Sequence, residues 1–258
     1  MTCKVKYSVL TIIMEHIMKR IISFLVILCV ATSLFALGSI RVGGSFSLVT
    51  GRTKPFTQED KSTIVRYTSS GFGFDILGKD DLSDSIATWF DFNMTFGTSG
   101  KIKNYNDSEW TSFDDLFKNA EAYAKSFGGT AKKKLYSLSA SGGVMYKLPF
   151  TNTHFNYAIG GGLFIDRLFA DITVYLPEDY NKGDRVRCFN VGLTTYSEIS
   201  NKLSDHFGVS LTVMLRLGIL NFSTNAKMEN GKILEELRAF GFAPSFNMPV
   251  VLGVSYYF

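Results

Sequence analysis

The sequence has few of the features that commonly stabilise or anchor an exported protein. Only three of its 258 residues are cysteines, and Cys3 and Cys29 both lie within the first 36 residues. If that segment is removed, Cys188 alone remains, which excludes an intramolecular disulfide in the rest of the chain. After Ala36 no apolar run reaches the roughly 18 residues of a membrane-spanning helix. Any membrane crossing after Ala36 therefore needs another type of structure.

Charge and metal ligands are also sparse. The formal net charge of +4 comes mainly from the start of the chain, where Lys4, Lys6, Lys19 and Arg20 oppose Glu15. The remaining 23 basic and 22 acidic residues nearly balance, so nothing indicates a nucleic-acid partner. The residual cysteine and the two later histidines lie far apart in sequence, and we predict no metal or cofactor site.

Residues 1–36 predict a leader with a signal peptide. Met18-Lys19-Arg20 is a basic start, residues 21–30 are apolar, and residues 31–36 end in a small-residue exit at Ala36. We expect translation to start at Met18 and cleavage to follow Ala36, leaving residues 37–258 as one domain. Two alternatives remain open: an uncleaved helical anchor, and lipidation at Cys29, where the preceding Leu28 is bulky for such a site.

Segments that alternate in polarity follow the leader. The chain is rich in Phe (23), Tyr (12) and Gly (23), which favours strands. The clearest segment, about 206–220, sets Phe207, Val209 and Leu211 against Gly208, Ser210 and Thr212. Similar segments at about 38–50, 63–77, 85–97, 135–148, 154–166 and 186–199, with a closing one at 249–258, bring the predicted number of strands to eight.

The connections between these segments alternate in length. The odd ones are about 12, 37, 19 and 28 residues long, and the even ones have about five to seven, as in outer-membrane barrels with long external loops and short periplasmic turns. Lys79-Asp80-Asp81, Thr151-Asn152-Thr153 and Asn201-Lys202 are the expected turn residues. Within the third connection, 98–134, the apolar spacing of residues 110–127 fits either a short amphipathic helix or an irregular loop.

The bulky apolar face of these segments is predicted to meet lipid. The opposite face is dominated by Gly, Ser, Ala, Thr and Asn, which suits a narrow interior better than a solvated exterior. Arg66 and Arg187 are the two charges on the apolar face, and both lie near strand ends, where they can reach head groups. Charges on the small-residue face would be buried in the lumen and must pair. The predicted polar network of the lumen comprises Arg41, Asp75, Asp91, Asp166, Glu198, His206 and Arg216.

The last ten residues carry the most specific pattern. Val250, Leu252, Val254, Tyr256 and Phe258 form one apolar face, and the strand stops on an aromatic residue. This resembles the closing strand of bacterial outer-membrane β-barrels, and the mature chain is similar in pattern to small barrels of the OmpA-transmembrane, OmpX and OmpW types. The resemblance implies that Val254, Tyr256 and Phe258 act as an assembly signal for the barrel-assembly machinery. The aromatic girdle at the periplasmic end is predicted to include Tyr146, Phe155, Tyr157 and Phe207.

Two local patterns allow other interpretations. Ser204-Asp205-His206 has the residue types of a hydrolase triad, but consecutive residues in a turn rarely converge in the way that a triad requires. Gly160-Gly161-Gly162 lacks the following helix of a phosphate-binding loop and is better explained by close packing or a bend in a strand. We therefore expect a protein without enzymatic activity.

The expected fold is an all-β, eight-stranded antiparallel transmembrane barrel in the outer membrane, surrounded by outer-membrane lipid. OmpW-like barrels imply passage of small solutes, apolar ones among them, so a narrow channel or carrier is the first functional hypothesis. A surface-exposed binding, adhesion or structural protein is the alternative. In both cases small solutes or external ligands would be met at loops 98–134 and 221–248.

Overall fold

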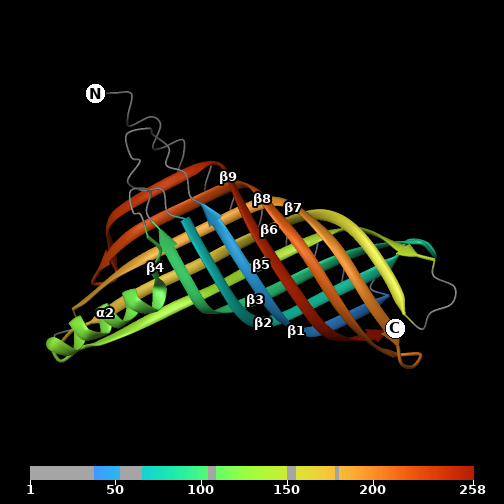
Figure 1. Ribbon diagram of the computed structural model, residues 1–258, viewed down its shortest axis with the longest axis horizontal. Coiled ribbons are helices and arrows are strands. Elements are labelled where there is room, and N and C mark those ends of the chain that lie inside the picture. The colour runs from blue at the N-terminus through green and yellow to red at the C-terminus, as the bar shows by residue number, and fades with distance from the viewer. Residues whose placement is uncertain (1–37, 53–65, 104–108, 150–154, 178–179) are drawn as a thin grey trace.

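The computed structural model describes residues 38–52, 66–103, 109–149, 155–177 and 180–258. The predicted leader, with its alternatives, and the expected turn at residues 151–153 lie outside the described residues. The described chain is dominated by one antiparallel sheet that closes on itself (Figure 1). Eight strands form the ring: β1 (Ser39–Arg52), β2 (Arg66–Asp81), β3 (Ile86–Lys103), β5 (Thr130–Leu148), β6 (Asn156–Tyr175), β7 (Asn181–Lys202), β8 (Phe207–Glu229) and β9 (Lys232–Tyr257).

The barrel closes between its first and last strands. β1 pairs with β2 on one side and with β9 on the other, in a register that runs from Ser39↔Tyr257 to Thr50↔Phe246. Every other pair in the ring is antiparallel and adjacent in the chain, apart from β3 and β5, which flank the short β4 (Thr111–Ser112). The prediction of an eight-stranded antiparallel barrel is confirmed.

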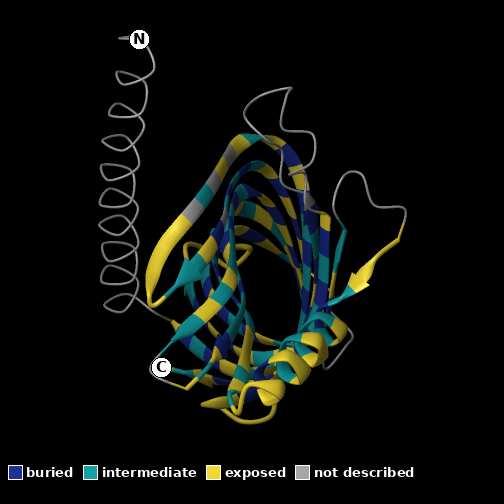
Figure 2. Cartoon of the chain, turned by 90° about the vertical axis from the view of Figure 1, so that its left-hand side faces the viewer, coloured by how far each residue is buried: buried dark blue, intermediate teal, exposed yellow. Residues whose placement is uncertain are grey.

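The two faces of the wall differ as the alternation predicts. On β8, Leu211 is 43% exposed whereas its neighbour Thr212 is fully buried, and on β9 Leu252 is 68% exposed beside a buried Val251. Figure 2 shows this striping of exposed and buried residues around the ring. So many large apolar side chains on an outer surface would be unfavourable in water. Their solvent is the hydrocarbon of a membrane.

Two turns at the periplasmic end share one design. Residues 82–85 join β2 to β3, and residues 203–206 join β7 to β8. In the first, Ser83 Oγ accepts a hydrogen bond from Ile86 N at 3.1 Å; in the second, Ser204 Oγ accepts one from Phe207 N at the same distance. The expected turn residues 79–81 and 201–202 belong instead to β2 and β7, so these two turn assignments were wrong by a few residues.

At the outer end, two of the predicted long loops are strands. β6 and β7 continue to residues 175 and 181, and the predicted loop 221–248 is a hairpin of β8 and β9 that turns at Asn230-Gly231. Both turn residues have positive φ (47° and 73°), the geometry that favours Asn-Gly in two-residue hairpins. Beyond the apolar belt the outward strand face meets water instead of lipid, so polarity no longer alternates there and the sequence pattern that marks a strand is lost.

The third connection contains a helix. α2 (Phe113–Ser126) begins at the N-cap Ser112, whose hydroxyl accepts a hydrogen bond from Asp114 N, and it ends in a turn in which Gly128 has a φ of +72°. It packs on β5, β6 and β3 at the outer end, so the helical alternative for residues 110–127 is confirmed. Among the described residues, none of the helical segments has the length and apolar character needed to span a bilayer.

Candidate functional site

The lumen near the periplasmic end holds a cluster of four charged side chains from three strands. Arg41 on β1 contacts Asp75 on β2 at 2.5 Å and Glu198 on β7 at 3.6 Å. Glu198 also pairs with Lys79 and accepts a hydrogen bond from Tyr196. The two cations and two carboxylates balance, which lets the barrel bury them.

A second ion pair lies further along the lumen. Arg216 on β8 contacts Asp91 on β3 at 2.6 Å, and both side chains are fully buried. The same guanidinium donates to Ser139 Oγ at 2.6 Å and to Ser141 Oγ at 3.1 Å on β5. Arg216 therefore ties three strands together across the interior.

Apolar side chains fill the space between these ion pairs. Trp89 and Tyr196 stack with ring centroids 5.0 Å apart, and Met214 and Met145 are buried beside them. The full cluster comprises Leu77, Ala87, Trp89, Met145, Ala158, Tyr196 and Met214. These residues share the strand parity that the sequence marks as small and polar, and their role as a plug was not predicted. Together with the charged network they pack across the interior in this half of the lumen.

Asp166 differs from the other lumen carboxylates. It is 2% exposed, yet among the described residues no cation lies within ion-pair distance of it. Its carboxylate accepts hydrogen bonds from Asn190 Nδ2 at 2.6 Å and from Asn247 Nδ2 at 3.3 Å. Asn221 donates in turn to Asn190 at 2.6 Å, so amides replace cations at this level.

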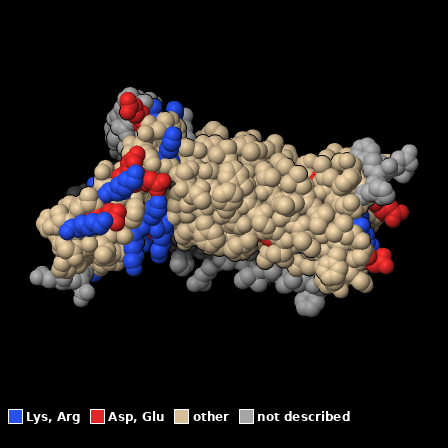
Figure 3. Space-filling view, turned by 60° about the horizontal axis from the view of Figure 1, so that its bottom comes forward, with Lys and Arg blue, Asp and Glu red and all other residues tan. Residues whose placement is uncertain are grey.

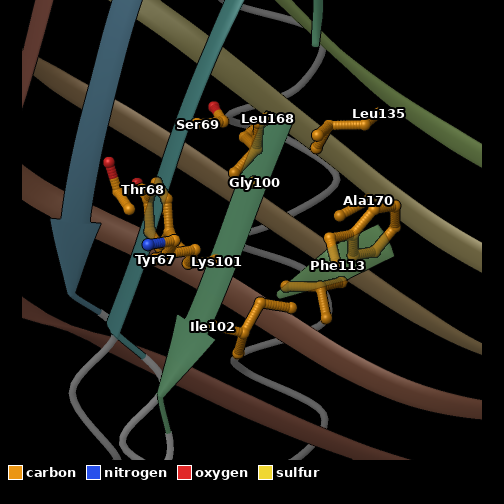
Figure 4. Close-up of a pocket in the computed structure, with 11 residues that line it drawn as sticks. Tyr67, Thr68, Ser69, Gly100, Lys101, Ile102, Phe113, Leu135, Leu168 and Ala170 are labelled. Atoms are coloured by element: carbon orange, nitrogen blue, oxygen red, sulfur yellow. The ribbon is translucent and has the colours of Figure 1, made fainter. Parts of the chain in front are cut away.

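Above the Asp166 cluster lies a pocket with an apolar lining, the apolar pocket. Tyr67 joins the two, because it lines the pocket and its hydroxyl accepts a hydrogen bond from Asn190 Nδ2 at 3.3 Å. Figure 4 shows Gly100 and Ile102 on β3, with Leu135 and Phe113 on one side of that strand and Tyr67 of β2 on the other. The lining residues are Tyr67, Thr68, Ser69, Gly100, Lys101, Ile102, Phe113, Leu135, Leu168, Ala170 and Val186.

The hydrogen-bonded ladder between β3 and β5 ends beside this pocket. The pairing between β3 and β5 stops at Phe96↔Tyr136. Beyond that point residues 97–103 of β3 pair with β2 and β4, while residues 130–135 of β5 pair with β6. We call this the β3–β5 gap. The side chain of Leu135 occupies it, since a Cβ built on Gly97 would lie 2.4 Å from Leu135 Cγ.

Most predicted lumen residues lie inside the barrel, but one does not. The structure buries six of them: Arg41, Asp75, Asp91, Asp166, Glu198 and Arg216. His206 was assigned wrongly: it is exposed in the turn before β8, where Nδ1 contacts Tyr257 O at 3.2 Å and the ring stacks on Tyr256. Lys79 was missed, although it has the same parity as Asp75 and could have been found by extending that strand.

The remaining predicted residues lie on the outside or in turns. Phe207, Tyr256 and Phe258 are exposed and in edge-to-face ring contact at the periplasmic end, and Tyr146 and Phe155 are about half exposed on the same end. Tyr157 is partly buried there. The Ser204 hydroxyl stabilises its turn by accepting a hydrogen bond from Phe207 N, as the Ser83 hydroxyl does from Ile86 N in the other turn. Within the described part of the chain, no group of three His, Cys, Asp or Glu side chains is arranged to hold a metal ion.

Comparisons with known proteins give structural neighbours only. No family model matches the sequence, and no curated protein matches it. The fold is similar to the outer membrane protein OprG from Pseudomonas aeruginosa (11% identity, 86% of this chain and 97% of that chain, TM-score 0.48). It is also similar to a major outer membrane protein from Thermus thermophilus (12%, 83% and 99%, 0.48) and to the outer membrane protein AlkL (13%, 86% and 91%, 0.42).

Three properties follow from the geometry of the chain itself. The strands form a closed ring, the outer face is apolar, and the charges lie in the lumen and at the two ends. These are the properties of a barrel that crosses a bilayer with every backbone group paired within the sheet. The chain is an eight-stranded β-barrel protein of the bacterial outer membrane.

Proposed function

We propose that this protein is a narrow carrier for small apolar solutes, which enter the apolar pocket from outside and leave sideways through the β3–β5 gap. The observation that carries the proposal is the position of the pocket: it lies at the outer end, directly beside the place where the two strands separate. The lumen below is filled by ion pairs and by the Trp89 cluster, so the gap is the shorter route out.

Leu135 is the side chain that controls this route. It lines the pocket and occupies the gap against Gly97 and Gly100, where a Cβ on Gly100 would lie 2.9 Å from Leu135 Cδ2. A flexible apolar side chain between separated strands can move without breaking backbone hydrogen bonds. A solute that passes there goes from an apolar pocket into hydrocarbon and never loses an apolar environment.

The test is uptake by liposomes that contain the refolded mature protein. Ala170→Phe fills the pocket and should reduce uptake of a small apolar probe to the protein-free background, whereas Leu135→Ala should increase it. Ala122→Phe, on the exposed face of α2, is the matched control and should leave uptake unchanged. Uptake by Ala170→Phe equal to that of the parent would refute the proposed route.

A binding or adhesion role is the second candidate, because the outer extension of β8 and β9 exposes Leu234 (60%) and Phe242 (76%). Removing residues 225–229 and 232–237 joins Thr224 through the existing Asn-Gly turn to Arg238, its partner in the ladder. If the shortened protein keeps solute uptake but loses adherence of the cells that carry it to a host surface, adhesion is the main role. The proposal includes no catalytic step.

A further inference from the structure

Basic side chains gather on the outside of the barrel where the apolar belt ends. On the outward parity of β5, β6 and β7 lie Lys132, Lys134, Arg167, Arg185 and Arg187, opposed by the single carboxylate Asp171; we call these five cations the outer basic band. Figure 3 shows charged residues at both ends of a long surface that is almost free of charge between them, and most of the Lys and Arg lie at one of these ends. The band lies at the level of the outer head groups.

The sheet register places these cations side by side. Phe169 pairs with Tyr136 on one side and with Arg187 on the other, while Lys134 pairs with Asp171. The guanidinium groups of Arg167 and Arg187 each lie 4.8 Å from the centroid of the Phe169 ring. Two guanidinium groups are thus held next to one ring at the membrane interface.

The cations of the band differ in how far they are neutralised. Arg187 contacts both oxygens of Asp171, with Nη2 2.6 Å from Oδ2, and Arg185 Nε lies 4.0 Å from Oδ1 of the same residue. Arg167 and Lys134 are exposed, and neither has an ion-pair partner among the described residues. Their charge is therefore available to an anion that approaches from the membrane side.

Apolar residues continue directly below the band. Leu163 and Leu193 pair across β6 and β7 and are 65% and 52% exposed, and Ile165 pairs with Val191 between them and the cations. An acyl chain could lie along these residues while its head group meets the band. A soluble anion would use the cations but not the apolar strip.

We infer that the outer basic band is a binding site for a lipid with an anionic, phosphate-bearing head group in the outer leaflet. Arg167 binds the phosphate with its planar, multi-donor guanidinium group, Lys134 adds a point charge, and Leu163 and Leu193 contact the acyl chains. The site lies outside the barrel and is independent of the solute pocket.

The mature protein refolded in mixed vesicles of phosphatidylcholine and phosphatidylglycerol provides the test. After mild solubilisation, mass spectrometry measures the ratio of the two lipids that stay bound. Each cation near a membrane surface strengthens anionic-lipid binding about fivefold, so the double variant Arg167→Gln/Lys134→Gln should lower the phosphatidylglycerol enrichment about 25-fold. Lys118→Gln/Lys125→Gln on α2 removes the same charge away from the band and should keep it.

Heat-modifiable gel migration verifies that each variant is a folded barrel. The single variant Arg167→Gln should lower the phosphatidylglycerol enrichment by a smaller factor, about fivefold. The inference is overturned if the parent shows no enrichment or if the α2 variant loses as much as the band variant. It is also overturned if inorganic phosphate displaces the lipid from the parent, because the cations would then bind a free anion without using the apolar strip.

Discussion

The two halves of the lumen contain similar polar residues but stabilise their buried carboxylates in different ways. In the periplasmic half, each carboxylate has a cation: Asp75 and Glu198 share Arg41, and Asp91 has Arg216. In the outer half, Asp166 is bound by amides, and an apolar pocket and a separated pair of strands lie above it.

This difference suggests that the periplasmic half of the lumen contributes mainly to stability and the outer half to the proposed transport. Ion pairs connect several strands in the periplasmic half, which the proposed solute route does not cross. In the outer half, amide hydrogen bonds take the place of ion pairs, and the apolar pocket lies on the proposed solute route. Substitutions in the first half should therefore reduce stability, and substitutions in the second should alter transport with little effect on stability.

The largest expected effect is that of Arg41→Met. It leaves Asp75 without its ion-pair partner and removes one of the two cations near Glu198, and the loss of one member of a buried pair costs about 3–5 kcal/mol. Urea unfolding of the protein in phosphatidylcholine vesicles, followed by tryptophan fluorescence, would measure it. The double variant Arg41→Met/Asp75→Asn should recover part of the loss, and a decrease below about 1 kcal/mol in the single variant would contradict the comparison.

Gly162→Val should have the next largest effect. A Cβ at Gly162 would lie 2.0 Å from the carbonyl oxygen of Gly142 on β5, whereas one at the outward-facing Gly161 would meet only Thr194 O at 3.5 Å. Overpacking of this kind costs about 1–3 kcal/mol. The same unfolding assay should place Gly161→Val within error of the parent, and equal losses in the two variants would argue against close packing as the reason for these glycines.

Asp166→Asn should cost less than Asp91→Asn. Asp166 loses one hydrogen bond to Asn247, about 1 kcal/mol, and leaves no cation unpaired among the described residues. Asp91→Asn leaves Arg216 without its partner and should approach the cost of Arg41→Met. If unfolding midpoints of the two variants coincide, the two halves of the lumen are not stabilised in different ways.

The smallest effect on global stability is expected for Gly231→Val. Its φ of +73° disfavours a branched side chain, but the turn lies far from the membrane-embedded part of the barrel. We expect an unchanged unfolding midpoint together with faster amide exchange in residues 225–237, measured by hydrogen exchange. A lowered midpoint would mean that the outer hairpin unfolds together with the rest of the barrel.

The sequence predicts the barrel where the membrane imposes its pattern and fails where it does not. Leu211, Leu252 and their neighbours must face lipid, so their alternation identifies strands. Above the belt no such constraint acts, and bulges at Gly218/Leu220 and Lys227/Met228 also shift the parity, so the sequence predicts a loop after Asn221 where the structure has a hairpin.

Inside the barrel, polarity predicts which residues point inward but not which of them meet. Asp75 and Asp91 were placed in the lumen, yet their different partners depend on the shear of the whole ring. Trp89 and Tyr196 both lie on the small, polar parity of their strands, but their contact joins β3 to β7, which are not neighbours in the sheet. Asp166 and the pocket above it require the same long-range information.

The Asn230-Gly231 hairpin also determines what the surroundings of the cell can recognise. Between Thr224 and Arg238 the outer hairpin is a pair of hydrogen-bonded strands, so an antibody epitope there is a conformation and not a linear peptide. Antisera raised against synthetic peptides from this region should bind the intact cell poorly, and antigenic variation by insertion should concentrate at the two turn residues, where added length leaves the ladder unbroken.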